Sequence, residues 1–167
     1  ILNSFLFLVS GFLVMLMALG FCLLESGMVT SKSVSAIAAK NIGLYSISGI
    51  MFWLVGYNLA YGIPEGGYIG SFTTWTDGSA LADGYSASSD WFFQMVFCAA
   101  TASIVSGTLA ERIKIWPFFL FAAILTGIIY PIEMGWQWGG GWLATIGFSD
   151  FAGSTLVHST GGAAALA

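Results

Sequence analysis

Hydrophobic residues in this chain form long runs separated by shorter polar stretches. Each of the first four runs is close to the roughly 20 residues that a helix needs to cross the hydrocarbon core of a bilayer. A fifth run continues to the last residue, and as a helix it would be about 27 Å long. The pattern predicts an all-α, polytopic membrane helical bundle whose spans cover about residues 1–26, 39–61, 91–110, 116–136 and 150–167.

The four basic residues fall in two places and predict the orientation of the bundle. Lys32 and Lys40 follow the first predicted span, and Arg112 and Lys114 lie between the third and the fourth. Connections rich in Lys and Arg stay on the cytoplasmic side of a membrane. We therefore expect both of these connections to be cytoplasmic. The remaining connections contain no basic residue and are expected outside, together with the N-terminus.

The composition supports a membrane protein and argues against several other classes. The chain is 57% hydrophobic and 7% charged, whereas soluble domains carry about 25% charged residues. No basic run is present, which argues against a nucleic-acid partner. Cys22 and Cys98 lie inside apolar spans and are interpreted as small buried hydrophobic residues. No catalytic triad, metal cluster or phosphate-binding loop appears, so we expect neither an enzyme nor a bound cofactor.

The fifth run begins with a carboxylate and contains the chain's only histidine. In a continuous helix His158 would lie about 12 Å from Asp150 along the axis, and Asp150, Ser154, His158 and Gly162 would share one face. An ionisable residue at this depth is costly and indicates a polar or ion pathway. The spacing alone leaves a second interpretation open. In that interpretation Asp150 caps the helix, and His158 makes an ordinary contact between helices.

Several motifs, in this order along the chain, resemble the ammonium transporter family (Amt/MEP/Rh). The match covers most of the chain from Gly20 onward, and its last segment is the most specific. The motifs are GFCLLESG at 20–27, Lys40-Asn41, WFFQMVF at 91–97, GTLAERI at 107–113, WGGG at 138–141 and DFAGSTLVH at 150–158.

The resemblance implies a homotrimer in which each subunit has eleven helices and its own pore. Helices one to five and six to ten of that fold are inverted repeats, and this chain corresponds to the first repeat, the N-terminal half of the transport domain. Because the fifth run ends at Ala167 without a polar flank, we expect the chain to be part of a longer polypeptide. The implied setting is the plasma (inner) membrane, with ammonium or ammonia as substrate and a PII-type regulatory protein as a partner typical of the family.

The resemblance also implies roles for particular residues. Trp138 would be the cation–π wall of an external ammonium recruitment site, and Phe97 would belong to a phenyl gate beneath it, with Phe93 a weaker candidate for the vestibule. Asp150 would orient nearby backbone and hydroxyl groups, and His158 would be the first of two pore histidines. The second histidine and a recruitment-site serine would belong to the missing half. Taken singly, an interfacial tryptophan, a core phenylalanine and a helix cap remain ordinary alternatives.

Three functions are compatible with this resemblance. The first is ammonium transport through a pore. The second is an ammonium sensor, in which the same domain is fused to a signalling module. The third is an Rh-like channel for neutral gas, which Trp138 argues against because that branch relies less on this tryptophan.

Three residues depart from simple apolar spans. Glu25 has Lys32 and Lys40 within reach, which predicts a structural ion pair. Glu133 lies near the outer end of the fourth span, where it would raise the local ammonium concentration, contact a second subunit or be solvated. Pro131 is predicted to kink the fourth helix.

Overall fold

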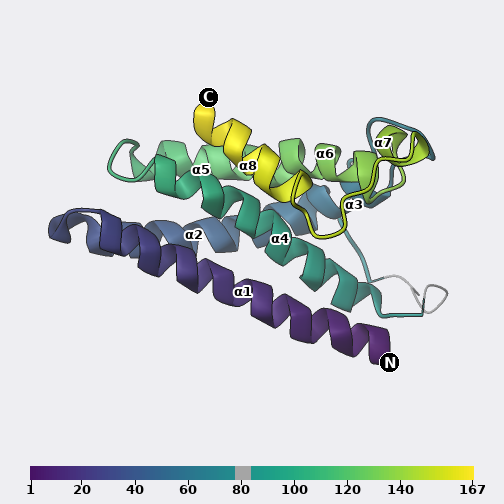
Figure 1. Ribbon diagram of the computed structural model, residues 1–167, viewed down its shortest axis with the longest axis horizontal. Helices are drawn as coiled ribbons and strands as arrows, with labels where there is room; N and C mark the ends of the chain where they lie inside the picture. Colours follow the sequence, from purple (N-terminus) through teal and green to yellow (C-terminus); the bar gives the residue numbers. More distant parts are fainter. Residues whose placement is uncertain (78–83) are drawn as a thin grey trace.

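The computed structural model is a bundle of helices, and it describes residues 1–77 and 84–167 (Figure 1). Those residues contain no strand. In chain order the elements are α1 (Leu2–Met28), η1 (Ser31–Ser33), α2 (Val34–Met51), η2 (Phe52–Gly56), α3 (Tyr57–Tyr61), α4 (Ala87–Thr108), α5 (Ile115–Ile124), η4 (Leu125–Ile129), α6 (Tyr130–Gln137), α7 (Trp142–Thr145) and α8 (Leu156–Leu166).

Four helical segments are long and apolar enough to cross a membrane, as the hydrophobic pattern predicts. They are Leu2–Met28, Ser31–Tyr61, Ala87–Thr108 and Ile115–Thr145. The second begins earlier than expected because the small polar residues after Ser31 are already helical. Apolar side chains cover the outside of α1, and Phe12, for example, is 51% exposed. Apolar surface of this extent suits contact with lipid or with other membrane helices.

The fifth predicted span is wrong at its start, because α8 begins at Leu156 and not at Asp150. Gly153 has a φ of +77°, a left-handed conformation that interrupts a right-handed helix. The carboxylate of Asp150 meanwhile accepts hydrogen bonds from backbone amides later in the same loop. Asp150 and Ser154 consequently do not share a helical face with His158. The described helix has 11 residues, a length of about 16 Å.

The helix predicted to kink at Pro131 contains a π-helical turn just before it. Proline has no N–H and cannot complete the regular α-helical ladder, and η4 ends two residues before Pro131. A second π-helical turn, η2, packs against η4. Their approach is close at Gly56, where an added Cβ would lie 3.1 Å from Pro131 Cγ and 3.2 Å from the Thr126 carbonyl oxygen. A larger residue at position 56 would therefore push its neighbours apart at this crossing.

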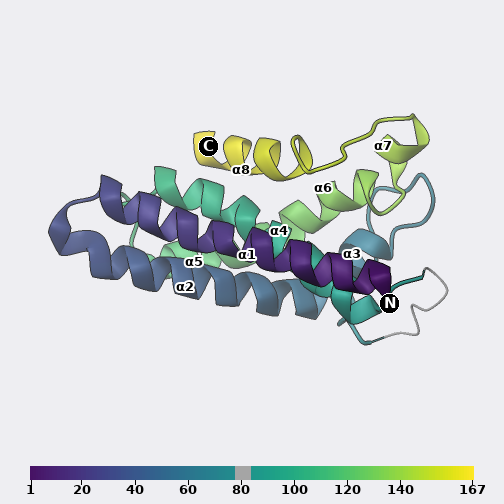
Figure 2. The same ribbon diagram turned by 60° about the horizontal axis from the view of Figure 1, so that its bottom comes forward.

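Helix α4 lies at the centre of the bundle, packed against α1, α2 and α8. Figure 2 shows α8 along one side of the bundle, with its C-terminus directed toward the α4–α5 turn. The middle of α4 is buried and built from small residues, which allow close approach of helices without large side chains between them. These residues are Cys98, Ala99, Ala100, Thr101, Ala102 and Ser103.

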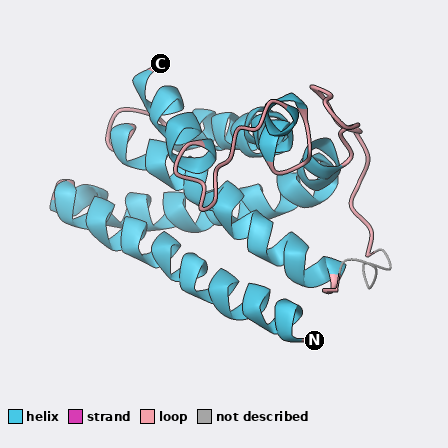
Figure 3. Cartoon of the chain, turned by 45° about the vertical axis from the view of Figure 1, so that its right-hand side comes forward, coloured by secondary structure: helices cyan, strands magenta, loops and turns pink. Residues whose placement is uncertain are grey.

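The short turns α1–α2 and α4–α5 lie at one end of the bundle, and the longer connections lie toward the end that holds the N-terminus (Figure 3). We call the first the basic end, because it carries Lys32, Arg112 and Lys114. Glu111 joins its two turns: its carboxylate accepts hydrogen bonds from the Thr30 amide and the Thr30 and Ser33 hydroxyls. These hydroxyl donors lower the pKa of Glu111.

The orientation argument counts Lys40 as a loop residue. The structure instead places it in α2, where its side chain is buried. Its Nζ lies 3.1 Å from Glu25 Oε2 and donates to the Ser106 carbonyl oxygen at 2.7 Å. The same carboxylate oxygen accepts hydrogen bonds from Ser106 Oγ and Asn41 Nδ2. The predicted ion pair of Glu25 is confirmed with Lys40, and it ties α1, α2 and α4 together.

Removing one partner of this pair leaves a buried charge without compensation. We expect Glu25→Gln or Lys40→Met alone to destabilise the protein by about 3–5 kcal/mol. The double variant E25Q/K40M should recover most of this loss, because no buried charge remains. The melting temperatures of the four purified full-length proteins in detergent test this. Equal melting temperatures of the single and double variants would show that the two charges are not coupled.

Candidate functional site: an aromatic row leading to a histidine

Trp138 lies where α6 ends, and its ring is held in place by a backbone acceptor. The indole Nε1–H donates to the carbonyl oxygen of Asp150 at 2.7 Å. The three glycines after Trp138 make a turn packed against α3. An added Cβ at Gly139 would lie 2.1 Å from the Ala60 carbonyl oxygen, and Gly140 has a φ of +78°. The chain can therefore turn sharply beside the indole only with glycine at these positions.

A row of aromatic rings extends from Trp138 along α4. The Phe97 and Trp138 ring centroids are 6.2 Å apart at an interplanar angle of 70°, and those of Phe93 and Phe97 are 5.0 Å apart at 74°. Phe7 of α1 stacks on Phe93 at 5.1 Å. Edge-to-face contacts at these distances are favourable for aromatic pairs. Phe97 is half-buried, between the indole and the small-residue core of α4.

Asp150 is buried, and its carboxylate is directed at the backbone of the next residues. Oδ1 accepts from the amides of Gly153 and Ser154, and Oδ2 from those of Thr155 and Leu156, at 2.8 to 3.0 Å. Burial on its own would raise the pKa of the Asp150 carboxyl, but the four amide donors outweigh it and lower the pKa. Hydrogen bonds to a carboxylate favour its charged form. Asp150 thus organises the start of α8 as an anion.

His158 lies in the first turn of α8 and has an exposed side chain. Its Nδ1 is 3.0 Å from the Gly153 carbonyl oxygen. A carbonyl oxygen only accepts, so Nδ1 carries a proton, and in the neutral ring Nε2 is then the acceptor. Within residues 1–77 and 84–167, Nε2 makes no hydrogen bond. The ring therefore presents a basic nitrogen that the surrounding fold does not use.

The four residues singled out in the sequence are joined by an unbroken series of contacts. Phe97 touches Trp138, Trp138 donates to Asp150, Asp150 accepts from the Gly153 amide, and the Gly153 carbonyl accepts from His158. Gly153 is the residue that sequence reasoning misses. It supplies both an amide and a carbonyl, and its place in the DFAG segment is the available signal.

Two further residues shape the same region. An added Cβ at Gly161 would lie 2.9 Å from Ile104 Cβ and 3.0 Å from the Thr101 carbonyl oxygen, so glycine is needed where α8 crosses α4. Glu133 is half-buried on α6, and it lines one cavity together with Thr160 of α8. The carboxylate therefore lies against α8 rather than standing free in solvent.

Long apolar helices surround a small-residue core, and an aromatic row is joined to a histidine through the Asp150–Gly153 loop. These features define a polytopic membrane protein with a built polar site. Residues 5–167 match the Ammonium Transporter Family. The chain belongs to this family.

Individual relatives agree with this assignment. The chain is 40% identical to the ammonium transporter Amt2 of Archaeoglobus fulgidus over 173 residues, which cover 96% of this chain and 36% of that protein. The solved structure of a sensor Amt protein matches with a TM-score of 0.89 and 38% identity, covering 96% of this chain and 41% of that one. The crystal structure of Candida albicans Mep2 matches with a TM-score of 0.86 and 26% identity, covering 98% and 37%. The chain thus spans well under half the length of these proteins.

Substitution of Gly153 tests how strongly the loop holds the site. We expect Gly153→Ala to lower the melting temperature, because alanine is disfavoured at a φ of +77° and its Cβ would lie 2.5 Å from Val157 Cγ2. Strain of this kind costs about 1–3 kcal/mol. Gly147→Ala is the matched control, since Gly147 has a φ of +85° with no atom within 4 Å of an added Cβ. If both variants melt alike, close packing at Gly153 contributes nothing beyond backbone strain.

Proposed function

We propose that the complete protein carries ammonium across the membrane, and that the series of contacts from Phe97 to His158 belongs to its conduction route. The observation that carries the proposal is the continuity of this series. It links a phenyl ring, an indole and an imidazole through the backbone of Asp150 and Gly153. The route requires the remainder of the polypeptide, because this chain forms only one side of it.

Trp138 would act first, as the recruitment site for the cation. A cation over an indole face gains about 2 kcal/mol when it is desolvated. The hydrogen bond from Nε1 to the Asp150 carbonyl oxygen fixes the plane of the ring. The ring is therefore already fixed before the ligand binds, which reduces the entropic cost of binding. Phe97 stands beside the indole, where its ring would act as a gate.

His158 would act deeper in the route. Moving a bare cation through an apolar passage is costly, whereas neutral ammonia crosses it far more easily. The free Nε2 would accept an N–H of the substrate, and an imidazole nitrogen can also carry the proton. The resemblance implies a second histidine and a serine from the missing half, which would complete this arrangement.

The orientation follows from the charges at the ends of the bundle. Lys32, Arg112 and Lys114 lie in the turns of the basic end, and the positive-inside rule assigns that end to the cytoplasm. Trp138 would then face the outside of the plasma membrane, as uptake requires. A homotrimer and a PII-type regulator at the cytoplasmic face are further parts of the proposal that rest on the resemblance.

An ammonium sensor is the second candidate, supported by the TM-score of 0.89 to a sensor Amt protein. Both functions would use the same recruitment site. They differ in the segment that comes after the membrane domain in the complete polypeptide. A kinase-like or cyclase-like module there would favour the sensor, and a short tail would favour the transporter.

Replacement of His158 tests the conduction route. In the full-length protein reconstituted in liposomes, His158→Ala should lower the ammonium-evoked current by about tenfold or more, because a positioned proton acceptor contributes about 10²–10⁴-fold where proton transfer limits the rate. Solid-supported membrane electrophysiology measures the current. Ser159→Ala, one residue away on α8, is the matched control and should keep most of it. A full ammonium current in His158→Ala would remove this residue from the route.

Replacement of Trp138 tests recruitment separately from conduction. Trp138→Leu should raise the ammonium concentration for half-maximal current by about tenfold or more, since loss of about 2 kcal/mol corresponds to roughly 30-fold in affinity. Trp138→Phe keeps an aromatic face and should be affected less. An unchanged half-saturating concentration and unchanged selectivity in Trp138→Leu would rule out the cation–π role.

A further inference from the structure

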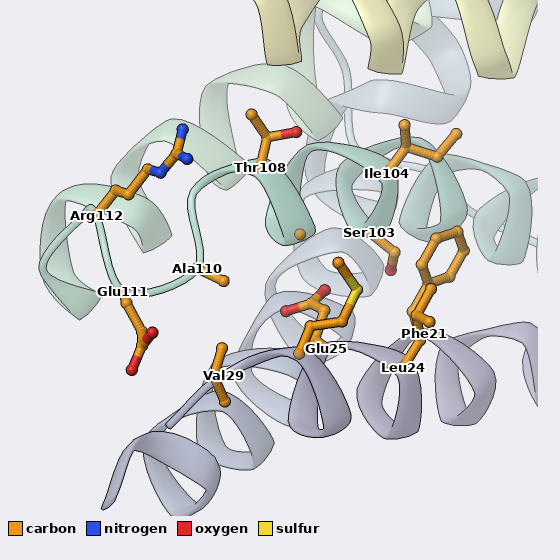
Figure 4. Close-up of a pocket in the computed structure, with 12 residues that line it drawn as sticks. Phe21, Leu24, Glu25, Val29, Ser103, Ile104, Thr108, Ala110, Glu111 and Arg112 are labelled. Atoms are coloured by element: carbon orange, nitrogen blue, oxygen red, sulfur yellow. The ribbon is translucent and has the colours of Figure 1, made fainter. Parts of the chain in front are cut away.

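A cavity of about 580 Å³ opens at the basic end, between the last turns of α1 and α4 and the α4–α5 turn (Figure 4). Phe21, Leu24 and Met28 of α1 form one wall, and Ile104 and Gly107 of α4 form another. This volume is within the range of small-ligand sites. The cavity is separate from the aromatic row, which lies nearer the opposite end of α4.

Glu25 supplies the cavity with a buried acceptor that has no partner. The residue is only 2% exposed. Its Oε2 accepts from Lys40, Asn41 and Ser106, whereas its Oε1 has no hydrogen-bond partner among the residues that the structure describes. Figure 4 shows the Glu25 carboxylate among the side chains that line the cavity. A buried carboxylate oxygen is normally satisfied, so one left open beside a cavity points to a ligand with a hydrogen to donate.

The charged groups around the cavity, with Lys40 counted, are two acidic and two basic side chains. Two carboxylates, Glu25 and Glu111, and one guanidinium, Arg112, are among its lining groups. The carboxylate of Glu111 is already occupied by Thr30 and Ser33, which leaves Glu25 as the open acceptor. Lys40 places an ammonium group 3.1 Å from the other oxygen of the same carboxylate. The structure thus contains an N–H donor of the right chemistry bound to one side of Glu25.

Ile104 connects the cavity to the helix that carries His158. Ile104 lines the cavity and is the residue against which Gly161 of α8 packs. Gly161 comes after His158 by about one helical turn. The cavity therefore shares one side chain with the α4–α8 contact that lies near His158.

We propose that this cavity is a second ammonium site, in which Glu25 Oε1 accepts an N–H of the substrate at the cytoplasmic end of the route. The inference rests on the proposed transport function and adds an exit site to it. A single directional acceptor suits a tetrahedral N–H donor. Alkali and alkaline-earth cations instead require several oxygen ligands. Because Lys40 already shares the carboxylate, binding is weak, which suits a site that must release its ligand.

The test uses the full-length protein in membrane vesicles of both orientations, with methylammonium as the probe. Gly107→Leu places a side chain in the cavity and keeps both residues of the Glu25–Lys40 pair, with its Cβ 3.8 Å from Glu25 Cγ. E25Q/K40M removes the charged acceptor without leaving a buried charge. We expect either variant to raise the half-saturating methylammonium concentration at the basic face by about five- to tenfold, the loss expected for one hydrogen bond of ordinary net strength. The half-saturating concentration at the Trp138 face should stay near the wild-type value.

Gly20→Leu is the matched control, because an added Cβ at Gly20 of α1 meets no atom within 4 Å and the residue does not line the cavity. Unchanged half-saturation at the basic face in both test variants would overturn the exit site and leave the transport function standing. An equal shift at both faces would also overturn it, since it would indicate a general effect on the protein. Wild-type vesicles without a methylammonium response at either face would reject the transport function and the exit site together.

Discussion

The buried carboxylate of Asp150 is the interaction on which the candidate site depends. Four amide hydrogen bonds hold it, and in return it fixes the backbone from Gly153 to Leu156. That geometry directs the Gly153 carbonyl at His158 and the Asp150 carbonyl at the indole of Trp138. A single anion thus sets the orientation of two rings that lie on different elements. Loss of the charge would leave four backbone donors without an acceptor, which is costly in a buried loop.

The small residues of α4 provide the scaffold around this interaction. They allow α1, α2 and α8 to approach one helix from several sides, and Gly161 brings α8 close to the Thr101 carbonyl. The same helix carries Phe97 toward one end and borders the Glu25 cavity at the other. Both sites are therefore positioned by one rigid element. Close packing of this kind transmits small displacements rather than absorbing them.

Much of the fold is predictable from the sequence, because membrane spans follow from length and hydrophobicity, and four spans are found in this way. The start of the fifth span is not predictable from the sequence. An i, i+4 spacing from Asp150 suggests a helical face, although Gly153 interrupts the helix. Lys40 counts as a loop charge in the sequence, which does not reveal that its long side chain reaches a buried carboxylate. The π-helical turns leave no recognisable signal apart from Pro131.

The candidate site is predictable in its residue types but not in its connections. The motifs contain Phe97, Trp138, Asp150 and His158, and the structure joins them. The links run largely through backbone atoms, above all the carbonyls of Asp150 and Gly153. Every residue has such a carbonyl, so side-chain identity cannot show which one is used.

The π-helical turn η4 has a consequence for where the indole lies. A π turn inserts one additional residue into a helix, and one residue corresponds to a rotation of about 100° around the helix axis. The direction in which each residue after Ile129 points from the helix axis therefore depends on this turn. Glu133 and Trp138 are among these residues. If η4 were ordinary α-helix, the indole would be rotated about the helix axis by more than a quarter of a turn, away from Phe97. The rotation set by this turn, as much as the identity of the residues, places the Trp138 ring beside Phe97.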